Sequence, residues 1–268
     1  MKSHSIACMI LATFLASISI AGAAEPRDIE FTAKIDGTLQ RYVTIEPDGF
    51  GRGKPANMLI ALHGHGSDRW QFVRDGRGEC KAARESAARH GMLFVSPDYR
   101  AKTSWMGPKA EADLVQIIEE LKSKCDVRKV ILCGGSMGGT AALTFASLHP
   151  ELIDGVVAFN GTANLLEYER FQDAIAESFG GTKQEIPEEY RKRSAELHFD
   201  KLTMPVAATT GGKDDIVPPQ SVLRLIEKLE KSNADALSIH RPDGGHSTDA
   251  ADSSAALEFV IGKAIDSK

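Results

Sequence analysis

The stretch "ILCGGSMGGTAAL", residues 131–143, places one serine among four glycines. An apolar run leads into it and an alanine-rich run follows it. Glycine is unfavourable inside strands and helices, so this density indicates a backbone shape that only small residues allow. Gly-x-Ser-x-Gly between a buried strand and a helix is typical of the nucleophile elbow, a sharp turn that exposes a serine hydroxyl. Ser136 is therefore the candidate nucleophile.

Outward from this turn, apolar runs alternate with amphipathic stretches along most of the chain. Residues 29–45 predict two short strands around the turn at Asp36-Gly37, and residues 108–124 predict a helix with one apolar face. Such alternation is typical of crossover units on a mostly parallel sheet, and the continuous apolar strands indicate that helices cover both faces. We predict an α/β fold.

A serine becomes a nucleophile only when a base takes its proton. In this arrangement an acid and then a histidine follow the serine along the chain. His246 in "DGGHS", residues 243–247, lies after the last apolar strand and is the candidate base. In "GGKDDIVPP", residues 211–219, Asp214 is the preferred acid and Asp215 the alternative. The acid would fix the tautomer of the histidine.

Two backbone N–H groups are candidates for an oxyanion hole. Met137 begins the helix after the serine, so its N–H lacks a helical acceptor. The segment "LHGHGSD", residues 62–68, ends an earlier strand and should supply the second donor. We favour His65, with Gly66 as the alternative.

Neither a metal nor a cofactor is predicted. A metal pair at His63 and His65 would have only one nearby aspartate to complete it. The cysteines show no zinc-site spacing. Export favours disulfides, so the sequence leaves open whether Cys80 and Cys125 form one. Cys133 lies in an apolar strand pattern that indicates a buried thiol.

Trp105 and a charged insertion are expected near the carboxyl edge of the sheet. Trp105 follows a strand that ends near residue 99, so it is the candidate substrate-binding residue, with packing against the next helix as the alternative. Residues 163–199 are charged and aromatic and lack a buried strand. They predict a helical insertion that forms a small cap, or a plain helical crossover with a long loop. Asn160 just before them lies in an N-x-T sequon, which matters only in a host that glycosylates.

Residues 1–23 differ in composition from the rest. Lys2 precedes an apolar run over residues 6–20, and small residues follow. This order predicts a signal peptide, and hence a secreted or periplasmic protein whose mature part, residues 24–268, is a single domain. An uncleaved membrane anchor is the alternative, because the run is nearly long enough to span a bilayer.

Charge argues against nucleic acid as a partner. The formal net charge is −5, and nucleic-acid binding needs a basic face. The arginines and lysines between residues 69 and 89 are interspersed with Glu79 and Glu85, which predicts a solvated helix face. After removal of the signal peptide no membrane contact is expected.

With serine, acid and histidine in this order, the chain resembles the α/β-hydrolase superfamily. The resemblance rests on "LHGHGS", "GGSMGG", "GGKDDIVPP" and "DGGHS" and covers nearly all of residues 24–268. Small secreted esterases and the catalytic domain of prolyl-oligopeptidase-like hydrolases are the most similar members. The resemblance implies an acyl-enzyme mechanism without a cofactor.

The expected activity is hydrolysis of carboxylic esters, including acylated or feruloylated polysaccharide. Prolyl oligopeptidases carry a large propeller domain, and too few residues precede the first strands here to form one. A peptidase or amidase of the same fold is the first alternative. A catalytically inactive binding module is the second, although such a module has no reason to keep all three reactive residues.

Overall fold

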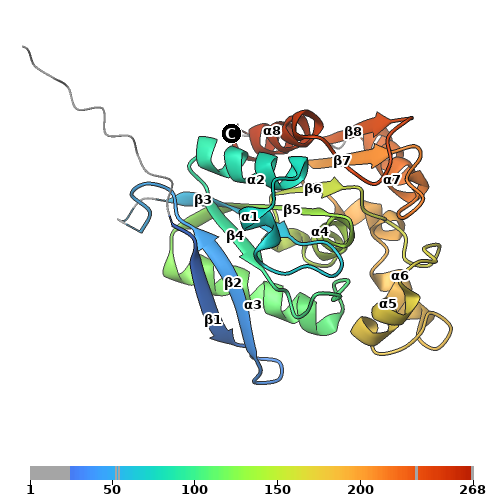
Figure 1. The fold of residues 1–268 in the computed structure, drawn as a ribbon, viewed down its shortest axis with the longest axis horizontal. Helices are drawn as coiled ribbons and strands as arrows, with labels where there is room; N and C mark the ends of the chain where they lie inside the picture. The colour runs from blue at the N-terminus through green and yellow to red at the C-terminus, as the bar shows by residue number, and fades with distance from the viewer. Residues whose placement is uncertain (1–24, 52, 54, 233–234, 267–268) are drawn as a thin grey trace, which may run out of the picture.

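One eight-stranded sheet crosses the molecule in the order β1-β2-β4-β3-β5-β6-β7-β8 (Figure 1). The computed structural model describes residues 25–51, 53, 55–232 and 235–266; the predicted signal peptide lies outside these ranges. The strands are β1 (Arg27–Thr32), β2 (Leu39–Ile45), β3 (Ala56–Leu62), β4 (Leu93–Pro97), β5 (Val127–Gly135), β6 (Gly155–Phe159), β7 (Val206–Gly211) and β8 (Ala236–Arg241).

Only the first two strands depart from a parallel arrangement. β1 pairs antiparallel with β2, and β2 pairs antiparallel with β4. Strands β3 to β8 are parallel, and β4, β6 and β7 are buried along their whole length. Parallel strands end at one edge of the sheet, so the loops that leave β3, β5, β7 and β8 meet there. The predicted α/β fold is confirmed.

Helices cover both faces of the sheet. The longer ones are α2 (Gly78–Arg89), α3 (Pro108–Lys124), α4 (Met137–Leu148), α7 (Gln220–Lys231) and α8 (Ala250–Asp266). The short ones are α1 (Gln71–Arg74), η1 (Pro150–Leu152), α5 (Gln172–Phe179), α6 (Pro187–Lys192) and η2 (Ala195–Lys201). Helices α2 and α8 lie side by side over one face, with Ala83 and Leu257 in its core. Helices α3, α4 and α7 cover the other, with Ile118, Phe145 and Leu225. None of the helices within the ranges above is long and apolar enough to cross a membrane.

The two faces keep Cys80 and Cys125 apart. Cys80 belongs to α2 on one face, whereas Cys125 directly follows α3 on the other. All three cysteines within the described ranges are free thiols, so Cys80 and Cys125, whose pairing the sequence left open, are not bridged. Cys133 is a buried thiol, as predicted, and burial raises its pKa.

Residues 163–199 hold α5, α6 and the start of η2, at one end of the molecule (Figure 1). Ion pairs and hydrogen bonds of a buried arginine attach this segment to the core. The guanidinium of Arg193 is almost fully buried and donates to Glu111 and Glu189 and to the carbonyl of Met106.

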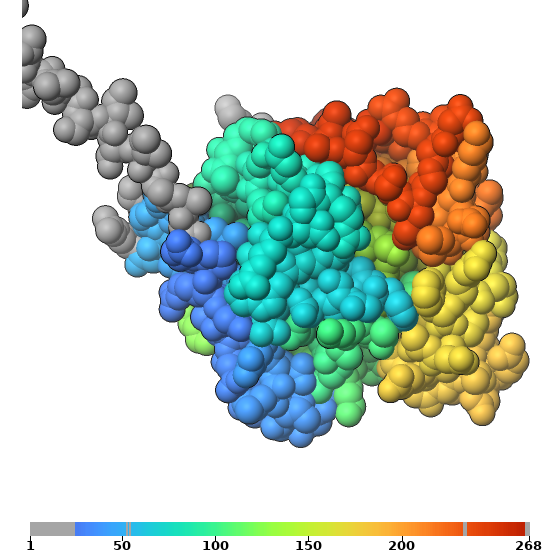
Figure 2. Space-filling model, in the orientation of Figure 1, coloured from blue at the N-terminus to red at the C-terminus, as the bar shows by residue number. Residues whose placement is uncertain are grey.

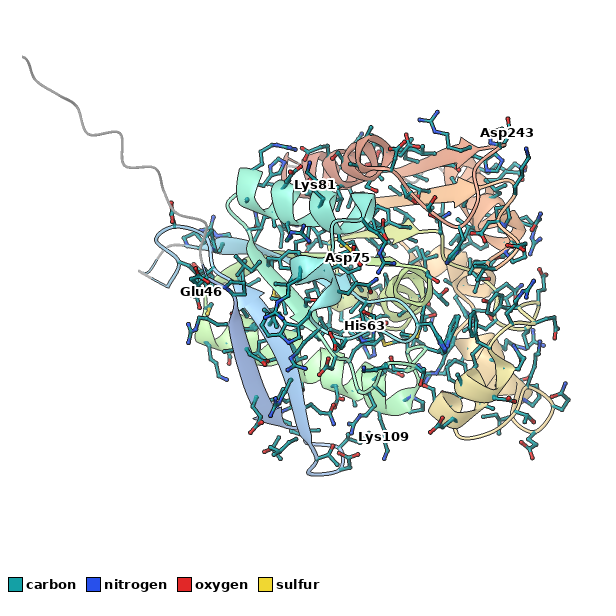
Figure 3. The ribbon with its side chains drawn as sticks, viewed as in Figure 1. Glu46, His63, Asp75, Lys81, Lys109 and Asp243 are labelled. Atoms are coloured by element: carbon teal, nitrogen blue, oxygen red, sulfur yellow. The ribbon has the colours of Figure 1, made fainter. Side chains whose placement is uncertain are left out.

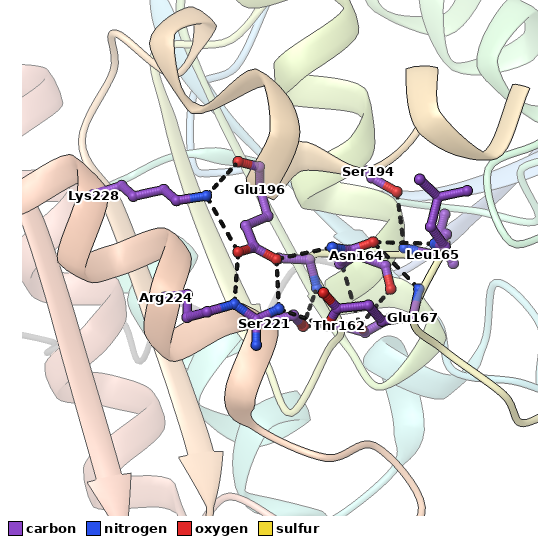
Figure 4. Close-up of polar contacts among 11 residues, drawn as sticks. Thr162, Asn164, Leu165, Glu167, Ser194, Glu196, Ser221, Arg224 and Lys228 are labelled. Carbon is purple, nitrogen blue, oxygen red and sulfur yellow. Dashed lines mark hydrogen bonds and ion pairs between the residues drawn. The ribbon is translucent and has the colours of Figure 1, made fainter. Parts of the chain in front are cut away.

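A second fastening joins η2 to α7 (Figure 4). The buried carboxylate of Glu196 accepts hydrogen bonds from Arg224, Lys228 and Asn164. Whether the segment acts as a cap stays a prediction.

Candidate active site

Ser136 lies in a sharp turn between β5 and α4. Its φ and ψ are 57° and −117°, a combination that side chains rarely adopt. Two backbone hydrogen bonds hold it there: its N–H donates to Phe159 O at 2.8 Å, and Thr140 N–H donates to Ser136 O at 3.0 Å. The hydroxyl is thereby set at the carboxyl end of the central strand.

The neighbouring glycines permit this turn because backbone segments touch there. A Cβ on Gly138 would lie 2.0 Å from the carbonyl oxygen of Leu62 in β3. A Cβ on Gly134 would lie 2.4 Å from the carbonyl carbon of Gly138. Larger residues would push the helix off the sheet, which accounts for the cluster of glycines in the sequence.

Three side chains from separate loops form one hydrogen-bonded chain. His246 Nε2 lies 2.9 Å from Ser136 Oγ, and His246 Nδ1 lies 2.7 Å from Asp214 Oδ2. A carboxylate accepts, so Nδ1 carries the proton and Nε2 is left to accept from the serine hydroxyl. Asp215, the alternative acid, is exposed. The structure thus brings together the serine, histidine and first aspartate singled out in the sequence.

The buried carboxylate of Asp214 is stabilised in its charged form. Burial raises its pKa, but hydrogen bonds from His246 and from the N–H groups of Val217 and Ile216 outweigh this and leave the pKa below its ordinary value. The acid therefore stays ionised next to the histidine, as a base-orienting group must.

Two threonines that no sequence motif marks, together with Asn160 of the sequon, hold the loop that carries His246. Thr248 forms a 2.6 Å hydrogen bond with Thr209 in β7 and donates to the side-chain oxygen of Asn160. Asn160 itself is buried, with φ 48°, so its sequon is not at the surface. No local pattern marks these contacts, because they join β6, β7 and the segment after β8.

The loop after β3 runs beside the serine. A Cβ on Gly64 would lie 3.8 Å from Ser136 Cβ. The Gly66 N–H is already used, because it donates to Lys102 O at 2.8 Å. The N–H groups of His65 and Met137 donate to no other residue in the part of the chain that the structure describes.

His63 is the first residue of this loop and is fully buried; its label stands near the middle of the view in Figure 3. Its Nδ1 is 2.9 Å from Gly64 O and its Nε2 is 3.2 Å from Asp98 O. Burial lowers the pKa of the imidazole, so the ring is neutral and only one nitrogen carries a proton. Tyr99 packs on the ring at 4.5 Å between centroids and donates its hydroxyl to His63 O. His63 is therefore a structural residue rather than a metal ligand.

Trp105 is fully buried, with φ 43°. It contacts the rings of three residues around the site. Its indole N–H donates to His65 Nδ1 at 3.1 Å. Its ring lies 5.5 Å from that of Tyr168 and 5.6 Å from that of Phe171, which also stacks on His65 at 4.3 Å. The two aromatic residues from the 163–199 segment were not predicted at the site, since only the folded chain brings them to Trp105.

The space-filling view shows a hollow among these segments (Figure 2). Red and orange atoms of the C-terminal segments, yellow atoms of the segment after β6 and cyan atoms of the loop after β3 surround it. Yellow-green atoms, the colour of the turn after β5, are visible at its base.

Comparison with known proteins adds a family and a set of similar folds. The model of the prolyl oligopeptidase family matches residues 88–260, which is more than half of the chain. No curated protein matches the sequence.

Three solved structures illustrate the shared fold. FphF, a fluorophosphonate-binding serine hydrolase of Staphylococcus aureus, is 18% identical over 90% of this chain and 98% of its own, with a TM-score of 0.69. An S-formylglutathione hydrolase from Agrobacterium tumefaciens is 14% identical over 89% and 95%, with a TM-score of 0.70. An acylaminoacyl peptidase from Pyrococcus horikoshii is 17% identical over 92% of this chain but 43% of its own, with a TM-score of 0.72.

Proposed function

The chain belongs to the prolyl oligopeptidase family and is a serine hydrolase, and from this premise we propose that it hydrolyses carboxylic esters through an acyl-enzyme. The observation that carries the proposal is the hydrogen-bonded chain from Ser136 through His246 to Asp214. Such a chain can take the serine proton at the moment of attack and return it to the leaving group.

The proposed reaction has two halves. Ser136 Oγ attacks the acyl carbon while its proton passes to His246 Nε2, and Asp214 stabilises the resulting imidazolium. The tetrahedral intermediate collapses as His246 gives this proton to the departing alkoxide, which leaves as an alcohol. Water then attacks the acyl carbon while its proton passes to His246 Nε2. The second tetrahedral intermediate collapses, the bond from the acyl carbon to Ser136 Oγ breaks, and His246 returns the proton to Oγ as the acid leaves. No cofactor takes part in the proposed scheme.

The N–H groups of Met137 and His65 are the proposed oxyanion donors. Met137 N–H is the first of a helix, where the positive end of the helix dipole adds to the hydrogen bond. His65 N–H is preferred over Gly66 N–H because the latter already donates to Lys102 O. The orientation of the Gly64–His65 peptide is fixed through its carbonyl group. Gly64 O accepts from Ser67 N–H at 3.2 Å and faces His63 Nδ1.

Trp105 is proposed to take part in substrate binding indirectly. Its indole is buried, so its effect passes through the rings that it supports, those of His65 and Phe171.

Two of the three similar structures, FphF and the S-formylglutathione hydrolase, are named as hydrolases, and the third is named as an acylaminoacyl peptidase. A peptidase of the same family remains the competing function, because the family is defined by prolyl oligopeptidases.

We also propose that the protein is exported and acts on esters outside the cytoplasm, including acylated or feruloylated polysaccharide. The support is the amino-terminal pattern in residues 1–23 alone. Amino-terminal sequencing of the protein recovered from its own host tests this. A mature chain that starts at or near residue 24 is expected, and an intact residue 1 would contradict export by cleavage.

Covalent labelling tests the nucleophile. Intact-mass measurement after incubation with a fluorophosphonate should show one adduct on the wild type and none on Ser136→Ala. An unlabelled, folded wild type would instead favour an inactive binding module.

Two chromogenic substrates then separate ester from peptide hydrolysis. We expect turnover of 4-nitrophenyl acetate and none of a proline 4-nitroanilide. Cleavage of the anilide at a comparable kcat/KM would establish the peptidase instead.

A further inference from the structure

The side chain of His65 has a fixed direction of hydrogen bonding. Trp105 Nε1–H can only donate, and it lies 3.1 Å from His65 Nδ1. His65 Nδ1 must therefore be the unprotonated nitrogen, which leaves the proton of the neutral ring on Nε2. Burial lowers the pKa of this imidazole, which keeps the ring neutral.

The donor at Nε2 is unused. It has no partner in the described ranges of the chain, and it is not among the buried polar atoms that lack one, so solvent reaches it. The ring to which it belongs is stacked on Phe171, a residue that is 37% exposed. A polar donor and an apolar ring face thus stand together at the loop after β3, one residue from Gly64.

This pair lies one residue from the part of the loop that approaches the serine. A Cβ on Gly64, the residue before His65, would lie 3.8 Å from Ser136 Cβ. On the other side, Tyr168 stacks on Trp105 and donates its hydroxyl to Ile216 O, two residues after the acid. The rings therefore bridge the serine side and the acid side of the site.

We propose that the His65 side chain binds substrate, with Nε2–H donating to an acceptor oxygen next to the scissile carbonyl and the Phe171 ring covering an adjacent apolar group. Trp105 is the positioning residue that selects the tautomer. This rests on the proposed function and names its substrate class: esters whose acyl group carries both a flat apolar group and a carbonyl, ether or hydroxyl oxygen. Polar–apolar pairs of this kind fix the orientation of small molecules in pockets.

A matched pair of esters tests the proposal. The 4-nitrophenyl ester of N-acetyl-L-phenylalanine has an amide oxygen beside the scissile carbonyl, and the 4-nitrophenyl ester of 3-phenylpropanoic acid lacks it. The measured quantity is the ratio of kcat/KM for the first ester to that for the second. Differences in intrinsic reactivity cancel when variant and wild-type ratios are compared.

Two variants should lower this ratio. His65→Phe keeps an aromatic ring against Phe171 but removes the donor, and Trp105→Phe removes the N–H that fixes the tautomer. Loss of one neutral hydrogen bond should lower the ratio about three- to tenfold in each. The control is Trp70→Phe, at the chain's other tryptophan, which lies beneath Arg74. It should keep the wild-type ratio.

The outcomes distinguish a failure of the proposed role of the His65 side chain from a failure of the proposed ester hydrolysis. Failure of the wild type to hydrolyse either ester would remove the proposed function and this inference with it. Turnover of both esters at a ratio that neither His65→Phe nor Trp105→Phe changes would overturn the inference alone.

Nitrogen NMR of ¹⁵N-histidine-labelled protein gives a readout that does not depend on activity. The His65 signals, assigned by their loss in His65→Phe, should show an unprotonated Nδ1 and a protonated Nε2. Trp105→Phe should move them toward a mixture of tautomers. A protonated Nδ1 in the wild type would overturn the proposal.

Discussion

Asp214 and Glu196 are both buried carboxylates, with side chains 1% and 5% exposed, yet their partners differ in kind. Glu196 is held by two cations, Arg224 and Lys228, that stay charged at any ordinary pH. Asp214 is held by backbone N–H groups and by one histidine, the side chain whose charge changes most readily. The first arrangement fastens η2 to α7, and the second leaves a partner free to gain and lose a proton.

The largest effect should come from removing the charge of Asp214. Asp214→Asn presents an amide to His246, which favours the wrong tautomer, so kcat for 4-nitrophenyl acetate should fall about 10⁴-fold. Thermal unfolding should change little, because the fold has other anchors. The matched control, Asp215→Asn, alters an exposed neighbour and should leave kcat unchanged. An equal loss in both variants would contradict the assignment of the acid.

The opposite result is expected at Glu196. Glu196→Gln removes a charge that three side chains solvate, and the free energy of unfolding should fall by about 2 kcal/mol. Urea unfolding measures this, with Glu230→Gln, an exposed position on α7, as the control. A loss of activity in folded Glu196→Gln comparable to that of Asp214→Asn would erase the distinction between the two carboxylates.

A smaller effect on both properties is expected at Thr248. Thr248→Val removes the hydroxyl that joins Thr209 and Asn160 below the histidine loop, so stability should fall by about 1 kcal/mol. The histidine would then be held less firmly, and kcat should fall about tenfold. Ser247→Ala, at the exposed neighbour, is the comparison variant. Unaltered kcat in Thr248→Val would show that the loop does not need this anchor.

The smallest expected effect is the pH dependence of the stability that Glu196 contributes. Burial raises the pKa of Glu196, but its hydrogen bonds with Arg224, Asn164 and Lys228 lower it to about 2, against an ordinary 4.5. A lowered pKa contributes stability above the ordinary value, and this is lost as pH falls through the lowered one. The gap in unfolding free energy between wild type and Glu196→Gln should therefore be full above about pH 5 and close toward pH 2. A gap that persists at pH 2 would show that packing, not charge, stabilises this site.

Much of this molecule follows from local sequence patterns. Strand and helix periods depend on neighbouring residues, and the turn at Ser136 depends on glycines within three positions, so the α/β fold was predictable. The motifs around Asp214 and His246 lie at strand ends, which a parallel sheet gathers at one edge; their catalytic roles stay predictions. Whether Cys80 and Cys125 pair was not predictable, because spacing along a chain does not tell on which face of a sheet each helix packs.

What the sequence could not supply are contacts between distant segments. Phe171 and Trp105 are far apart in the chain, and their rings meet only because Arg193 fastens the 163–199 segment to α3 and to Met106 O. Thr248 reaches Thr209 across a strand boundary that no motif marks. Such contacts depend on tertiary geometry alone.

The backbone at Ser136 sets two demands against each other. A φ of 57° suits glycine, which adopts it without penalty, whereas the proposed chemistry requires a hydroxyl at that position. Natural selection for hydrolysis and selection for a durable fold therefore favour different residues at this one codon. A lineage released from the first pressure would be expected to drift toward glycine at 136 while keeping its sheet, its helices and its charged fastenings intact. The residue at this turn would then record whether a descendant still works as an enzyme.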